Sequence, residues 1–252
     1  MWIDPLAKWR PELTGTPEFE SGRAELLAGR PEQARRHFEA GVLAHDLVGL
    51  GDALLLLGEH ERAAGCFQRA AERVMDPFVE CGLSQAFVLR GDAGTAVARL
   101  EALPPDPVVR HHLAGALLEV ADQVRSVTRD EQLVITSRRQ FDTCAHVARR
   151  VAEVAVDDVH LAAGQQLRTV TEEGQGWVWS QESAALGYSL FAALAGLAVV
   201  VVGGTTDSVL LVVLGALVGA AAIYGVVLAY RRQVWQVRAA RVAPMVWRHG
   251  PG

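Results

Sequence analysis

Two kinds of hydrophobic pattern divide this chain. Up to about residue 176, apolar residues recur at the three- and four-residue steps of helices that bury one face, as in Phe141, Cys144 and Ala148. From Ser183 to Thr206, and again from Ser208 to Tyr230, no residue is charged. Each of these stretches has at least the roughly 20 residues needed to cross a bilayer core. The pattern predicts an all-α protein with a C-terminal hairpin of two transmembrane helices.

A four-point pattern of small and apolar residues occurs three times in the front part of the chain. In each copy, a small residue is followed by Gly seven positions later, by Ala five beyond that, and by a large apolar residue four beyond the Ala. The three copies are Gly22/Gly29/Ala34/Phe38, Gly51/Gly58/Ala63/Phe67 and Ser84/Gly91/Ala96/Leu100. Small residues let two helices cross closely, and Gly permits the turn between them.

This arrangement resembles the tetratricopeptide repeat, in which pairs of helices stack and an aromatic residue fills the groove between neighbouring pairs. The turn glycines are 29 and then 33 residues apart, whereas this family prefers about 34. The resemblance implies a tetratricopeptide-like helical-repeat solenoid over residues 17–128. Proline residues, including Pro77 and Pro107, mark the boundaries between the repeats.

The resemblance also implies a concave face, formed by the first helix of each repeat, on which a partner protein binds. The matching positions of this chain are Arg23, Asp52 and Gln85, and His45, Leu55, Cys81 and Val88 lie nearby. The Lys and Asn pattern by which some family members hold a C-terminal carboxylate is missing. We therefore expect the ligand to be a helix or an extended segment of an unknown protein partner.

The pattern predicts five parts. They are an N-terminal segment (1–16), the repeats (17–128), a capping or connecting helix (129–176), the transmembrane hairpin (177–232, with spans at about 184–202 and 209–230) and a basic juxtamembrane tail (233–252). The capping helix would give the last repeat its atypical outer face. The tail alternates Arg with apolar residues, which is typical of a short helix lying on the membrane surface.

Both predicted spans carry small residues at a spacing that permits close helix packing. These residues are Ala192, Gly196, Gly215, Gly219 and Ala222. We expect them to pack the two spans against each other, and a homo-oligomer that pairs copies of the chain is the alternative. Neither span contains an ionisable residue, which argues against a conducting pore.

Charge is unevenly distributed. Residues 1–176 hold 19 Lys and Arg against 27 Asp and Glu, so nucleic acid, which needs clustered basic residues, is not an expected partner. Arg231, Arg232, Arg238 and Arg241 follow the second span, and the connecting turn has no basic residue. The positive-inside rule then predicts that the N- and C-termini are both cytoplasmic. We expect no cleavable signal peptide, because no basic stretch precedes an apolar run at the N-terminus.

The sequence also indicates a cellular setting. Lys8 is the only lysine, whereas Arg, Ala, Val and Gly are abundant. This composition favours a GC-rich, bacterial genome, so the expected location is the plasma (bacterial inner) membrane. The lipid bilayer is then a second partner.

Residues capable of chemistry are few. Cys66, Cys81 and Cys144 are widely spaced and odd in number, so we expect buried reduced thiols rather than disulfides or a zinc site. His111 and His112 are adjacent on a helix and point apart, and the segment from Asp157 to His160 is expected to be a solvated helix surface. No nucleotide, zinc or acyl-transfer motif occurs. The sequence predicts no enzyme, no cofactor and no bound metal.

These observations favour a membrane-anchored adaptor or scaffold that recruits protein partners to the cytoplasmic face. The alternative is a membrane-active effector or channel subunit whose hairpins oligomerise and whose repeats act as the sensor.

Overall fold

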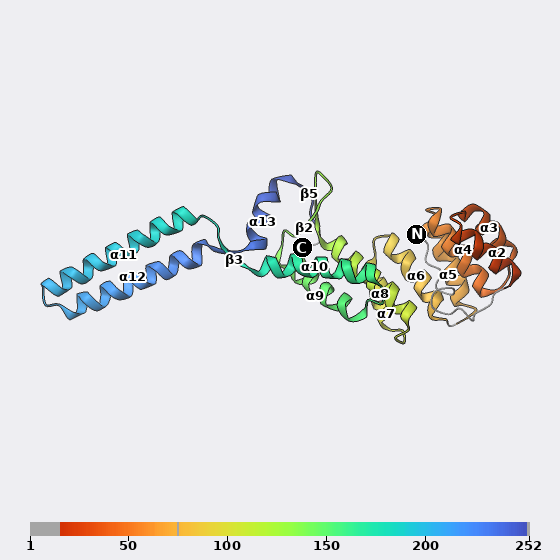
Figure 1. Cartoon of the computed structure of the whole chain (residues 1–252), viewed down its shortest axis with the longest axis horizontal. Helices are drawn as coiled ribbons and strands as arrows, with labels where there is room; N and C mark the ends of the chain where they lie inside the picture. Colours follow the sequence, from red (N-terminus) through yellow and green to blue (C-terminus); the bar gives the residue numbers. More distant parts are fainter. Residues whose placement is uncertain (1–15, 75, 251–252) are drawn as a thin grey trace. The chain divides into compact units, whose positions relative to one another are not determined.

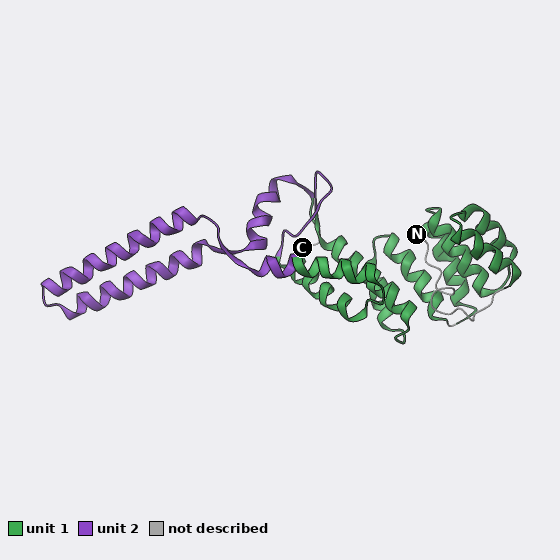
Figure 2. Ribbon diagram, in the orientation of Figure 1, with its two compact units in different colours: residues 1–126, 138–169, 248–252 green, residues 127–137, 170–247 purple. Residues whose placement is uncertain are grey.

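The computed structural model describes residues 16–74 and 76–250, and within them the fold is all-α apart from a few very short strands. The described residues divide into two compact units (Figure 2). Unit 1 comprises residues 1–126, 138–169 and 248–252, and unit 2 comprises residues 127–137 and 170–247. Apart from Thr16, the predicted N-terminal segment lies outside the described residues.

Unit 1 is built from consecutive helix pairs (Figure 1). The pairs are α2 (Pro17–Leu27) with α3 (Pro31–Ala40), α4 (Ala44–Leu56) with α5 (His60–Ala71), α6 (Pro77–Leu89) with α7 (Ala93–Glu101), and α8 (Pro107–Val124) with α9 (Arg138–Val154). The predicted helical-repeat solenoid followed by an apolar helical hairpin is confirmed as the fold class.

The same turn joins the two helices in each of the first three pairs. Gly29, Gly58 and Gly91 have φ angles of 73°, 78° and 84°, a region that glycine adopts without steric cost. After Gly29, the N–H of Arg30 donates to the C=O of Glu25 at 2.9 Å, and the equivalent bond recurs after the other two glycines. This is a Schellman motif, which satisfies the last carbonyl groups of the first helix.

Capping residues determine where α2, α6 and α8 begin. Thr16, Asp76 and Asp106 each accept a backbone N–H of the following helix through a side-chain oxygen. A proline follows each of these residues at the first helical position, where its missing N–H costs nothing. The local sequence therefore determines both ends of α2 and α6.

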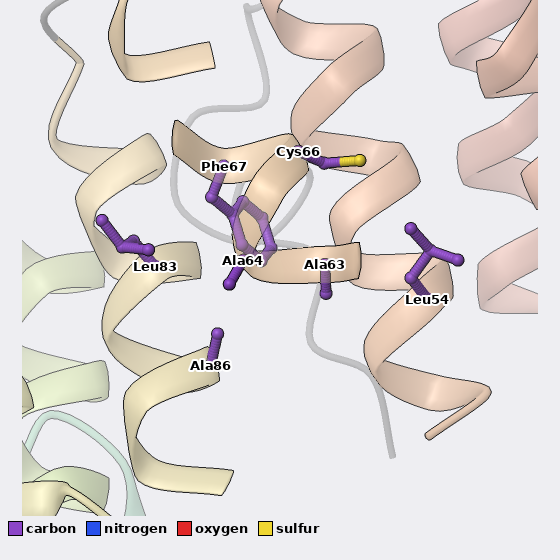
Figure 3. Packing of buried hydrophobic residues seen from close by; sticks show 7 residues of the cluster. All are labelled: Leu54, Ala63, Ala64, Cys66, Phe67, Leu83 and Ala86. Atoms are coloured by element: carbon purple, nitrogen blue, oxygen red, sulfur yellow. The ribbon is translucent and has the colours of Figure 1, made fainter. Parts of the chain in front are cut away.

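An aromatic ring joins each of the first two repeats to the next. A Cβ added to Gly51 on α4 or to Gly82 on α6 would lie only 2.6 or 2.3 Å from the Phe67 ring, so this ring fills the space left by two absent side chains. The buried cluster around Phe67 includes residues of α4, α5 and α6 (Figure 3). Phe38 lies in the same way between Gly22 and Gly49.

The segment predicted as one capping helix forms two. Helix α9 packs on α8, and the guanidinium of Arg110 donates to the last carbonyl groups of α9, those of Glu153 and Val154. A second helix, α10 (Asp158–Gln175), then begins after Asp157, whose side chain accepts the N–H of His160. This N-cap bond explains why a new helix starts here.

Unit 2 contains the predicted hairpin, formed by α11 (Glu182–Thr205) and α12 (Val209–Tyr230). At its base, β3 (Trp177–Trp179) pairs antiparallel with β4 (Arg231–Gln233), with Val178 opposite Arg232. Helix α13 (Val234–Val242) and a 3₁₀ turn, η1 (Ala243–Met245), follow. The strands β1 (Ser126–Thr128), β2 (Leu133–Val134) and β5 (Val246–Arg248) form a small sheet in the order β2-β1-β5. The sequence pattern did not predict these strands.

The two hairpin helices bury only the narrow stripe where they meet. Within that stripe, a Cβ added to Gly196 would lie 3.1 Å from Cα of Gly219 and 3.3 Å from the carbonyl oxygen of Gly215. Large apolar side chains cover the rest, and Phe191, for example, is 72% exposed. Both helices are long and apolar enough to cross a membrane.

We expect Phe67→Ala to lower the free energy of unfolding by about 3–5 kcal/mol, because it empties the space between two repeats. Denaturant titration of the full chain in detergent, followed by far-UV circular dichroism, measures this change. Leu27→Ala is the control, because Leu27 is exposed on α2 and should change stability by no more than about 0.5 kcal/mol. Equal effects of the two substitutions would show that the ring does not hold the repeats together.

We expect Gly219→Leu to destabilise the hairpin by about 1–3 kcal/mol, because the new side chain would push α11 away. Gly225→Leu is the matched control on the same helix, since no atom lies within 4 Å of a Cβ added there. Thermal unfolding and size-exclusion chromatography in detergent measure both effects. The size should stay unchanged in both variants, and a shift from oligomer to monomer in Gly219→Leu would instead place this contact between copies.

Candidate functional site

A cavity in unit 1 follows the first helices of successive repeats. It has a volume of about 490 Å³ and is lined by residues of α4, α6 and α8 together with His160 of α10. Repeat-equivalent positions line it: Asp52, Gln85 and Gly115 each lie eight residues after the first residue of their helix, and Leu56, Leu89 and Glu119 lie twelve after it. The cavity therefore arises from the repeat itself.

The structure brings together four of the seven positions predicted for partner binding. Asp52, Leu55, Gln85 and Val88 all line the cavity. Asp52 and Leu55 on α4 are three residues apart, and so are Gln85 and Val88 on α6, so the two members of each pair lie on one face of their helix. The side chains combine apolar surface with hydrogen-bonding groups, as a site for a protein segment requires.

The other three predicted positions lie elsewhere. Arg23 pairs with Glu20 on its own helix at 3.1 Å. His45 lies beside Asp76, whose carboxylate raises the pKa of this histidine. Cys81 is fully buried, and burial raises the pKa of its thiol well above the usual range, so the thiol stays protonated. None of these three residues lines the cavity.

All three cysteines are free and buried, as predicted. Burial raises the pKa of Cys144 to about 11, so this thiol is also protonated at neutral pH. Because the thiolate is the reactive form, the buried environment makes nucleophilic or redox chemistry at these positions unfavourable.

One end of the cavity carries a cluster of histidines around a single carboxylate. The Nδ1 atoms of His111 on α8 and His160 on α10 lie 2.7 and 2.9 Å from the same Oδ2 of Asp157. The ring centroids of His111 and His160 are 4.7 Å apart. The other oxygen of Asp157 accepts the backbone N–H of His160 at 3.0 Å, so this carboxylate joins two helices.

Burial and hydrogen bonding set the charge states in this cluster. Burial acts to raise the pKa of Asp157, but the backbone N–H of His160 and the side chains of His111 and His160 outweigh it and hold that pKa well below its usual range. Burial lowers the pKa of His112 to about 3, and its two histidine neighbours add to this effect. At neutral pH, Asp157 is therefore a carboxylate anion, whereas the ring of His112, which lines the cavity, is neutral.

The sequence predicts a solvated helix surface from Asp157 to His160, and the structure agrees only in part. Asp158 and Val159 are exposed, but the exposed fractions of the Asp157 and His160 side chains are only 13% and 17%. The reason is tertiary, because His111 contacts Asp157 from 46 residues away.

The small residues of the hairpin occupy a second set of positions, within unit 2. Gly215 and Gly219 are buried against α11, and a Cβ on Gly219 would also lie 3.8 Å from the carbonyl oxygen of Ala192. Ala222, in contrast, is exposed. The nearest atoms that a Cβ added to Gly215 or Gly219 would meet all belong to α11, in Ala192, Gly196, Val199 and Val200, so one chain supplies both sides of the interface.

The base of the hairpin gathers aromatic and basic side chains. The rings of Tyr188 and Tyr230 stack with centroids 5.9 Å apart, and the guanidinium of Arg231 lies 5.7 Å from the ring of Trp177. Arg232 and Arg241 line a cavity of about 480 Å³ with Ser180 and Gln236. This composition suits the boundary between membrane and water.

Comparison with protein-family models, with curated proteins and with solved structures finds no match to this chain. The resemblance to the tetratricopeptide repeat therefore stays a prediction from the three four-point patterns. The candidate sites are therefore the cavity of the repeats and the cluster of His111, Asp157 and His160.

Proposed function

We propose that this chain is a membrane-anchored adaptor that binds a protein partner in the cavity of its helical repeats. The observation that carries the proposal is the cavity itself, because equivalent positions of three successive repeats line it. Repeat proteins of this kind use such continuous surfaces for recognition. The apolar hairpin supplies the anchor.

The lining indicates what kind of segment the cavity accepts. Leu55, Leu56, Val88 and Leu89 provide apolar surface, and Leu56 and Leu89 are largely exposed. Asp52 and Glu119 add negative charge. An amphipathic helix with an apolar face and flanking basic residues fits this combination, in the helix-in-groove mode of recognition.

Two features of the hairpin favour an adaptor over a membrane-active effector. Gly196, Gly215 and Gly219, which could associate copies of the chain, are instead packed against the neighbouring helix of the same chain. No residue that is charged at neutral pH lies between Ser183 and Thr206 or between Ser208 and Tyr230, so the helices present no charged pathway for ions.

We expect partner binding to depend on the exposed leucines of the cavity. A photoreactive amino acid at Leu56 in the full chain should cross-link a discrete partner in cells, and the same group at Val42, which is exposed outside the cavity lining, should not. Leu56→Glu combined with Leu89→Glu should reduce co-purification of that partner by about tenfold or more, since buried hot-spot contacts contribute over 1 kcal/mol each. Val42→Glu is the charge-matched control.

Equal cross-linking from Leu56 and Val42, or equal recovery of the partner from both glutamate variants, would contradict a role for the cavity.

The location that we propose is the plasma (bacterial inner) membrane, with both termini cytoplasmic. Arg231, Arg232, Arg238 and Arg241 lie on one side of the spans, and the turn between α11 and α12 contains Asp207 but no basic residue. A reporter that is active only in the cytoplasm should be active after Gly252 and inactive when inserted at Thr205. The reverse pattern would overturn the assigned orientation.

A further inference from the structure

Three side chains at the end of the cavity have the arrangement of metal ligands. One nitrogen from each of His111 and His160 and one carboxylate oxygen of Asp157 lie within 4.8 Å of one another. The exposed fractions of the three side chains are 9%, 17% and 13%, so they are held in place rather than free in solvent. We propose that they bind one divalent transition-metal ion of the zinc class.

The donor set selects the class of ion. Imidazole nitrogen is a ligand for Zn²⁺, Co²⁺ and Ni²⁺, whereas Mg²⁺ and Ca²⁺ take oxygen ligands in larger number. The carboxylate of Asp157 supplies one negative charge, which offsets half the charge of the ion. Three protein ligands from two histidines and one carboxylate are also the number found in zinc sites that keep one position open.

The ligand atoms, which all lie within 4.8 Å of one another, must move to admit the ion. The two Nδ1 atoms lie 2.7 and 2.9 Å from Oδ2 of Asp157, which are hydrogen-bond distances. Ligand atoms around a tetrahedral zinc, with bonds of about 2.0–2.1 Å, are about 3.3 Å apart. A ring that binds the ion through Nδ1 has no proton on that atom and carries its proton on Nε2.

The surroundings hold these ligands in position. The backbone N–H of His160 fixes the second oxygen of Asp157, and α10 begins at this point. On α8, a Cβ added to Gly115 would lie 3.4 Å from Nε2 of His160. The equivalent positions in the preceding repeats are Asp52 and Gln85, so the loss of a side chain at position 115 makes room for the histidine ring.

The open position of the ion would face the cavity. Both His111 and His160 line the cavity, so water or a side chain of a bound protein segment can complete the coordination. This inference does not depend on the proposed adaptor function, because an ion held by three protein ligands needs no partner.

The test is a calorimetric titration of the full chain, purified in detergent without a histidine tag, with ZnCl₂, CoCl₂ and MgCl₂. We expect one zinc ion per chain with a dissociation constant on the order of micromolar or lower, similar binding of cobalt, and none of magnesium. His160→Gln and Asp157→Asn should each weaken zinc binding by about tenfold or more. His112→Gln is the control, because this neighbouring histidine lies outside the ligand set.

Asp157→Asn keeps a side-chain oxygen that can accept the N–H of His160, so α10 should remain capped. Circular dichroism melting of each variant then separates lost metal binding from lost folding. The proposal is overturned if zinc does not bind, or if folded His160→Gln and Asp157→Asn bind it as tightly as the natural sequence. The cluster would then be a hydrogen-bond network that only joins α8 to α10.

Discussion

The insertion of phenylalanine rings between glycines determines how the repeats stack. Phe38 and Phe67 each occupy the space of side chains that are absent from two successive first helices. This contact works in one register only, because a Cβ at any of the four glycines would lie within 3 Å of the ring. Close packing of this kind stabilises the interface and also fixes the relative position of the helices.

The cavity follows from that register. When successive first helices are held in the same relation, their eighth and twelfth residues after the helix start fall along one surface. The residues at these positions then differ from repeat to repeat without disturbing the core. At one such position, Asp52 supplies a charge, Gln85 supplies a hydrogen-bonding amide, and Gly115 leaves open space.

The hairpin also depends on close packing at glycines, here between two apolar helices. Gly196 and Gly219 let the backbones of α11 and α12 approach closely, which is how helices associate where no hydrophobic effect drives them together. The outer surfaces remain apolar and exposed. The internal packing of Gly196, Gly215 and Gly219 supports the proposal that the hairpin acts as an anchor.

Much of this protein was determined locally and could be predicted from the sequence. Gly29, Gly58 and Gly91 end helices because few other residues tolerate a positive φ, and the apolar spans are recognisable because a bilayer sets their length. The break before α10 was also local, since Asp157 is an N-cap residue that the pattern of apolar positions concealed. The paired strands and the histidine cluster were different. His111 meets Asp157 across 46 residues, and Val178 meets Arg232 across the whole hairpin. Only packing between distant segments brings these groups together, and no periodicity along the chain predicts such contacts.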